Sequence, residues 1–301
     1  MAIPASRLET WSHQGAIAQS RDTYATVKRA LEAATAPYTD RNFNPFLQGS
    51  YGNDTNIHTE SDVDIVIRYD GAFFRDLSRL PADQLAAYNA YFANGGATYR
   101  YIDFKSHVQT ALNTAFGAPA VRPGTKAIKI VANNSRRNAD VVVAYEYRRY
   151  YKFISEWDEH HDKGIGFLNS AGTLTGNFPH QHSENLTTKH QATGNRFKPI
   201  VRIFKNMRTR LVESGTIAAG IAPSYYIEGL LYNVPNVNFV ADQAQAVYNV
   251  LYWLATTVDR TNFVCANERY YLLRDNDPVC WPIANGPAFI NAVVSLWDGW
   301  R

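Results

Sequence analysis

Two short stretches decide the fold of this chain, Gln48-Gly49-Ser50-Tyr51 and Asp62-Val63-Asp64-Ile65. Apolar residues around the second stretch predict a strand, in which Asp62 and Asp64 project from one face and the intervening residues point to the core. The first stretch predicts a glycine turn at the end of an earlier strand, where the backbone can approach a phosphate closely. Together they predict a site that holds a nucleoside triphosphate against a divalent metal ion.

A third acidic residue, Asp140, is expected beside this pair. It opens a β-branched run that follows a turn-rich segment over 133–138 and an earlier strand over 126–131. This order predicts a hairpin that brings Asp140 next to Asp62 and Asp64. Magnesium prefers carboxylate and phosphate oxygens, and two ions can serve one in-line displacement. The three aspartates are therefore predicted to be catalytic and to bind two Mg²⁺ or Mn²⁺ ions.

Composition limits the class of protein. The chain has 301 residues, which is enough for a sizeable core, and its net charge of +3 suits nucleotide phosphates but is too small for a duplex-binding protein. Two cysteines provide neither a disulfide framework nor a multi-cysteine zinc site. No apolar run has the length of a membrane span, and the N-terminus lacks a secretory core. We expect a cytoplasmic protein that has no membrane partner and requires no nucleic acid.

The organisation of the chain predicts an α+β fold in two parts. A long helix is expected over 16–34, and mixed helix and strand patterns run from 43 to 168, with a helix over 103–116. Helical patterns dominate after residue 180. They cover 196–212, 223–232, 243–256 and 287–297. The predicted domains are 1–178, with the N-terminal helix and the mixed core, and 179–301, which is helical.

These motifs resemble a known superfamily. Gly49-Ser50, Asp62-x-Asp64 and Asp140 are similar to the pattern of the DNA polymerase β-like nucleotidyltransferases. Later stretches are similar to the bacterial cGAS/DncV-like nucleotidyltransferases (CD-NTases) of anti-phage signalling, closest to their clade E. Those stretches are Phe178-Pro179, 195–206 and 223–228. The resemblance implies a polymerase β-like core with a mixed sheet, a long N-terminal helix and a C-terminal helical bundle.

The resemblance also implies an activity. Such an enzyme joins nucleoside triphosphates, here UTP and ATP, through attack of a 3′-hydroxyl on an α-phosphate, and closes a cyclic di- or oligonucleotide second messenger. A monomeric enzyme of the bacterial cytoplasm is expected, and the partner of its product would be a downstream effector receptor. Two alternatives stay open. One is transfer of a nucleotide to a small-molecule, RNA or protein acceptor, and the other is a non-enzymatic module that binds nucleotide or RNA.

Phosphate-binding residues are implied by the same resemblance. They come from the glycine turn and from two later helices: Gln48, Gly49, Ser50, Lys205 and Ser224. In the first of these helices, Lys198, Arg202 and Lys205 recur at helical spacing and form a basic row. A solvated face is the other interpretation of such a row. A lysine ammonium is a compact charge suited to phosphate, which favours the binding role.

Two residues are implied to contact a base. Tyr225 would stack on it, a contact worth about 1–3 kcal/mol, although tyrosines also pack in cores. Asn177 precedes Phe178-Pro179, and its amide offers both a donor and an acceptor to a uracil edge. The alternative for Asn177 is a structural role in a turn.

Histidine-containing segments are the remaining metal candidates. The polar cluster over 158–162 is predicted to be a solvated loop. His180 and His182 are predicted to be polar residues near the nucleotide or on the surface, because no third ligand accompanies them.

Overall fold

The computed structural model describes residues 3–15, 17–59 and 62–300. Contacts divide the chain into two units. The helical unit comprises Met1–Ile17, Gly49–Ser61 and His180–Arg301, and the sheet unit comprises Ala18–Gln48 and Asp62–Pro179. A cut after residue 178 lies close to one of these boundaries, but two N-terminal segments belong with the C-terminal helices.

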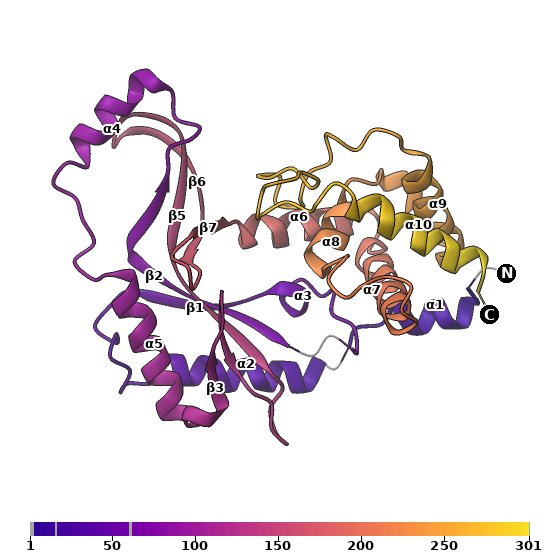
Figure 1. The fold of residues 1–301 in the computed structure, drawn as a ribbon, viewed down its shortest axis with the longest axis horizontal. Helices are drawn as coiled ribbons and strands as arrows, with labels where there is room; N and C mark the ends of the chain where they lie inside the picture. Colours follow the sequence, from indigo (N-terminus) through magenta and orange to yellow (C-terminus); the bar gives the residue numbers. More distant parts are fainter. Residues whose placement is uncertain (1–2, 16, 60–61, 301) are drawn as a thin grey trace. The chain divides into compact units, whose positions relative to one another are not determined.

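The sheet unit is built on seven strands (Figure 1). They are β1 (Phe43–Gln48), β2 (Val63–Asp76), β3 (Val121–Pro123), β4 (Ile128–Ile130), β5 (Ala139–Ser155), β6 (Asp158–Leu168) and β7 (Leu174–Asn177). The order is β1-β2-β5-β4-β3, with β6 between β5 and β7. Strands β2 and β5 run parallel, and the other pairs are antiparallel. The predicted mixed sheet and the hairpin that leads into β5 are confirmed.

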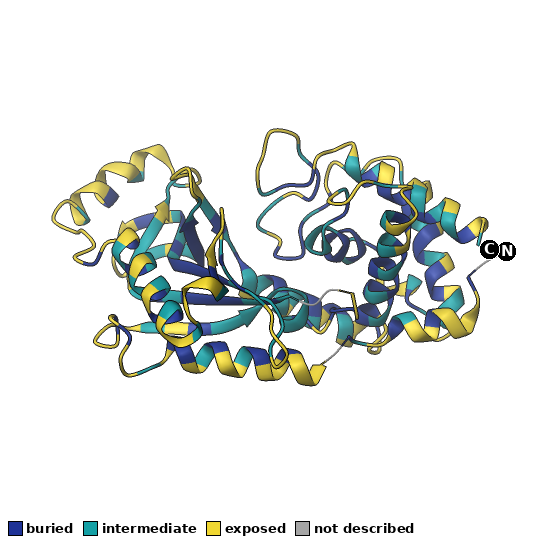
Figure 2. Cartoon of the chain, turned by 60° about the horizontal axis from the view of Figure 1, so that its bottom comes forward, coloured by how far each residue is buried: buried dark blue, intermediate teal, exposed yellow. Residues whose placement is uncertain are grey.

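Helices accompany this sheet. They are α2 (Ile17–Leu31), α4 (Leu85–Tyr91) and α5 (Tyr101–Phe116), with short 3₁₀ turns at Ala82–Gln84 and Ala118–Ala120. The ring of Phe104 in α5 packs against the rings of Tyr69 and Tyr145 on the sheet. Figure 2 shows the central strands as mostly buried and the outer faces of the helices as exposed. The predicted long N-terminal helix is confirmed as α2, although Ala16 lies outside the described residues.

The helical unit surrounds α7. Its helices are α1 (Ala5–Ser12), α3 (Gly49–Gly52), α6 (Pro179–Ala192), α7 (Phe197–Glu213), α8 (Ser224–Tyr232), α9 (Gln243–Thr256) and α10 (Asn285–Asp298), with a 3₁₀ turn at Asn236–Asn238. Phe197, Val201 and Phe204 recur at helical spacing on α7 and are fully or almost fully buried. Helix α1 joins this core through the buried Leu8, which explains why it belongs here and not with the sheet.

The predicted C-terminal helical bundle is thus confirmed. Within the three described ranges, no helix is both long enough and apolar enough to cross a membrane.

Candidate active site

A row of polar residues crosses four adjacent strands of the sheet unit. The strand register pairs Gln48 with Asp64, Asp64 with Asp140, and Asp140 with Lys129. Directly paired residues have neighbouring side chains on one face of a sheet. Alternation places Val63 on the opposite face, where it is buried. The structure therefore brings Asp140 beside Asp64, as predicted from the hairpin.

Asp62 lies just before β2, two residues before Asp64, and contacts the row through Lys129. Its Oδ2 atom is 3.1 Å from Lys129 Nζ, and its Oδ1 atom accepts a hydrogen bond from Asn138 Nδ2 at 3.1 Å. The strand was predicted to include Asp62, whereas β2 begins at Val63. As the side chains are placed, no three histidine, cysteine or acidic groups in the described ranges form a metal-binding set.

Charge is concentrated around Asp140. Burial raises the pKa of this carboxyl group, the neighbouring Lys129 ammonium opposes the rise, and the Asp62 carboxylate adds to it. The hydrogen bond to Asp62 raises the pKa of Lys129 in turn. Carboxylates that crowd together are stabilised by a cation. Their oxygen donors match the ligand preference of Mg²⁺ and Mn²⁺, so the residues present fit such an ion.

The glycine turn predicted after β1 is present in the helical unit. Gly49 follows Gln48 in the chain and has φ of 71°, a left-handed conformation that favours glycine. Ser50 lies in the short helix α3, and its carbonyl oxygen accepts the backbone N–H of Thr55 at 2.9 Å. This hydrogen bond closes the loop that follows the turn.

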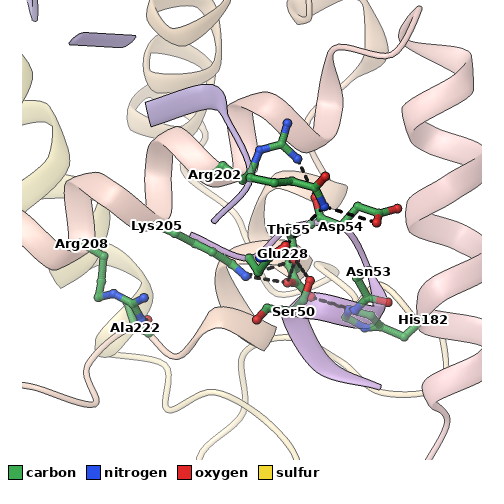
Figure 3. Close-up of polar contacts among 12 residues, drawn as sticks. Ser50, Asn53, Asp54, Thr55, His182, Arg202, Lys205, Arg208, Ala222 and Glu228 are labelled. Atoms are coloured by element: carbon green, nitrogen blue, oxygen red, sulfur yellow. Dashed lines mark hydrogen bonds and ion pairs between the residues drawn. The ribbon is translucent and has the colours of Figure 1, made fainter. Parts of the chain in front are cut away.

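A buried ionic cluster lies beside Ser50 (Figure 3). Lys205 is fully buried, and its ammonium donates to Glu228 Oε1 at 2.8 Å and to Thr55 Oγ1 at 3.2 Å. Glu228 also accepts from Thr55 Oγ1 at 2.5 Å and pairs with His182 Nε2 at 2.7 Å. Burial alone would raise the pKa of Glu228, but Lys205 and His182 hold it far below its usual range. Asn53 Nδ2 donates to Glu228 Oε2 at 3.5 Å as well, so four side chains stabilise this buried carboxylate.

The other members of the basic row hold the same loop. Lys198 Nζ pairs with Asp54 Oδ2 at 3.2 Å, and Arg202 Nη1 donates to the carbonyl oxygen of Asp54 at 2.5 Å. Arg202 Nε also donates to the carbonyl oxygen of Ser12. The row is thus not a solvated face, because its cations attach the loop after α3 to α7. A phosphate contact by Lys205 stays a prediction.

Sequence reasoning missed Glu228 as a site residue, although a signal was present. Glu228 stands in the apolar run Ile227 to Leu231 of a helix. A carboxylate in such a run is seldom buried without a cation. The search for its partner could have led to the basic row and to Lys205.

Ser224 and Tyr225 open α8 after Pro223. Helix α8 contacts α3, so Ser224 and Ser50 lie on neighbouring helices. The Tyr225 ring stacks on His182 with centroids 4.8 Å apart, and its hydroxyl accepts from Asn267 Nδ2 at 3.0 Å. Burial raises the pKa of Tyr225 well above its usual value.

The structure excludes one of the two positions predicted for His182 and corrects the prediction for the segment 158–162. His182 is 3% exposed and belongs to the Glu228 cluster, so it is not a surface residue. The segment 158–162 is the start of β6 rather than a solvated loop, because it pairs with β5. An ion pair of 2.5 Å between Lys152 and Asp158 lies at the turn that joins these strands.

Asn177 is the last residue of β7, and one residue, Phe178, separates it from α6. Its Oδ1 atom accepts the backbone N–H of Phe178 at 2.8 Å, which orients the amide group. It therefore lies at the end of a strand. Recognition of a base by this amide stays a prediction.

The chain is similar to characterised proteins along its whole length. The family model of the cGAS/DncV-like nucleotidyltransferase C-terminal helical domain matches residues 184–298. "Cyclic nucleotide synthase CdnE01" of Staphylococcus haemolyticus is 35% identical over 305 residues, covering 100% of both chains. The solved structure of the Rhodothermus marinus CdnE c-UMP-AMP synthase with Apcpp and Upnpp has a TM-score of 0.87 at 35% identity and covers 99% of this chain and 97% of its own. A cyclic dipurine nucleotide synthase of Elizabethkingia meningoseptica is 32% identical over 92% of this chain and 93% of that protein.

Proposed function

Because the chain belongs to the cGAS/DncV-like nucleotidyltransferases, we propose that it joins UTP and ATP into a cyclic di- or oligonucleotide with the help of Mg²⁺ or Mn²⁺. The observation that carries the proposal is the register that places Asp64 beside Asp140, with Asp62 two residues before Asp64 and in contact with Lys129. Three hard oxygen donors on one sheet face support metal-assisted transfer more directly than a binding role alone.

Asp62 and Asp64 would hold both ions, and Asp140 would hold the catalytic one. When bound, the two ions would lower the pKa of the attacking hydroxyl and stabilise the charge on the leaving pyrophosphate. Asp140 would also help to accept the 3′-hydroxyl proton.

Ser50, Lys205 and Ser224 would bind the donor triphosphate, together with Gln48 and Gly49, which directly precede Ser50 in the chain. Ser224 opens α8, and the N-terminus of a helix favours a negatively charged group. Lys205 lies in the buried cluster beside Ser50 (Figure 3), and its ammonium would have to turn from Glu228 to reach a phosphate. The alternative role for Lys205 is to fix Thr55 and thereby the loop that carries Ser50.

The proposal for the base rests on Asn177 and Tyr225. Relatives of similar identity are named for different products, one for c-UMP-AMP and one for dipurine nucleotides, so family membership leaves the base open. The Asn177 Oδ1 atom retains a second lone pair beside its bond to Phe178, and the amide N–H₂ group can donate. Tyr225 would stack on a base through the ring face that His182 does not cover. The product would act as a second messenger in anti-phage signalling, recognised by a separate effector.

The test is a product analysis. Purified protein is incubated with all four ribonucleoside triphosphates and Mg²⁺, treated with phosphatase, and analysed by mass spectrometry, with a sample in EDTA as the control. We expect a phosphatase-resistant cyclic product that contains UMP and is absent in EDTA. A product made only of purines would overturn the base assignment. Linear products alone, or transfer only to an added acceptor, would overturn the cyclic synthase.

A further inference from the structure

Lys129 continues the row of acidic residues across the sheet. It lies in β4, where the register pairs it with Asp140 of β5 on one side and with Arg122 of β3 on the other. Its ammonium is 3.1 Å from Asp62 Oδ2. The carboxylates of Asp64 and Asp140 are thus followed across the sheet by the cations of Lys129 and Arg122, and Lys129 also contacts Asp62.

A cation in this place competes with any metal ion that Asp62 binds. The ion must replace the ammonium at Oδ2, and the two positive charges repel each other while both are near. The side chains of Lys129 and Asp62 are 41% and 37% exposed, so water and salt screen part of this repulsion. The competition should therefore change metal affinity by a moderate factor.

Asp62 does not depend on Lys129 alone for its position. Asn138 Nδ2 donates to its other oxygen at 3.1 Å, and the backbone N–H of Val63 donates to the Asn138 carbonyl oxygen at 3.0 Å. Removal of the lysine charge should leave the carboxylate oriented. The contribution of Lys129 to metal binding can therefore be measured in a folded protein.

We propose that Lys129 is a positioning residue of the metal site, which neutralises Asp62 in the metal-free protein and sets cation affinity by competing for that carboxylate. The inference rests on the proposed function in one respect, the assignment of Asp62 as a metal ligand. It goes further in giving the chain an internal cation that the metal must displace. The ammonium of Lys129 then offsets part of the negative charge of the site before a metal–nucleotide complex arrives. A free divalent ion therefore binds this site less tightly than it would bind three carboxylates with no cation beside them.

The experiment measures Mn²⁺ binding to metal-free protein by electron paramagnetic resonance, without nucleotide. In Lys129→Met the ammonium is gone, so we expect binding about three- to tenfold tighter than in wild type. Lys129→Gln is a second neutral variant with the same expected direction. Lys129→Arg keeps the charge and should bind as wild type does. Lys126→Met removes an exposed lysine from the same segment and should change nothing.

The outcomes separate the two proposals. Unchanged or weaker Mn²⁺ binding in both neutral variants would overturn the role of Lys129, and a loss of thermal stability without tighter binding would mark the ion pair as structural only. The proposed metal site fails in a different way, because wild type itself would then show no Mn²⁺ site that Asp62→Asn weakens. In that case the inference falls with it.

Discussion

Replacement of Glu228 by glutamine should destabilise the helical unit strongly. The change keeps the shape of the side chain but removes the negative charge that Lys205 and His182 face. Lys205 is fully buried, so its ammonium would remain without a counter-charge from Glu228. Breaking a buried ion pair on one side costs about 3–5 kcal/mol, and we expect a loss of that size in the free energy of unfolding.

Urea unfolding followed by tryptophan fluorescence measures this loss. Five of the six tryptophans lie in the helical unit, and Trp157 is the exception, so the signal reports mainly on the unit that contains Glu228. The matched control is the double variant Lys205→Met/Glu228→Gln, which removes both charges. In the mutant cycle with Lys205→Met, we expect a coupling energy of about 2–3 kcal/mol. A loss of unfolding free energy below about 1 kcal/mol in Glu228→Gln would refute the reasoning, because a buried pair broken on one side should cost more. Effects of the two single variants that simply add up in the double variant would refute it too.

Three further perturbations test the sheet unit. Asp62→Asn/Asp64→Asn should abolish product in the mass-spectrometric assay while circular dichroism stays native, and retained synthesis by a folded variant would rule out the metal assignment. Asn177→Ser should lower the incorporation of UTP relative to ATP, because losing one base contact changes the free energy of discrimination by about 1–3 kcal/mol. An unchanged UTP-to-ATP ratio in the product at equal substrate concentrations would make Asn177 a structural residue. Burial alone would raise the pKa of Asp76, but hydrogen bonds from Ser78 and Arg149 lower it to about 2, so it stabilises the fold above pH 4 and loses this effect as the pH falls toward 2. Asp76→Asn should therefore cost about 2 kcal/mol at pH 7 and flatten that part of the acid unfolding curve, whereas an unchanged curve would contradict the assignment.

The shared face of Asp62 and Asp64 and the hairpin before Asp140 were predictable because alternation and turn residues are local. Two aspartates two residues apart share a face in any strand, and the turn before Asp140 leaves room only for a short hairpin. The pattern did not indicate that Lys129, on the other strand of the hairpin, pairs with Asp140. Lys129 sits in a three-residue strand, where periodicity is too short to indicate which face it takes.

The partners of the basic row were not predictable from spacing. Periodicity shows that Lys198, Arg202 and Lys205 share a face of α7, but it contains no information about what covers that face. The covering loop lies more than 140 residues earlier in the sequence, as the Lys198 to Asp54 ion pair shows. The burial of His182 was not predictable for the same reason, because its partner Glu228 belongs to another helix.

The interleaving of the two units has a consequence for biosynthesis. The ribosome completes Ala18–Gln48 and Asp62–Pro179 before it makes any of the helices that follow. The sheet and its row of carboxylates can therefore form on the nascent chain, since domains fold as units while synthesis proceeds. Helix α1 and the segment with Gly49 and Ser50 must wait until α7 emerges to supply Lys198, Arg202 and Lys205. We expect a nascent chain stalled before α7 to carry the folded carboxylate row while the glycine turn remains open to proteases.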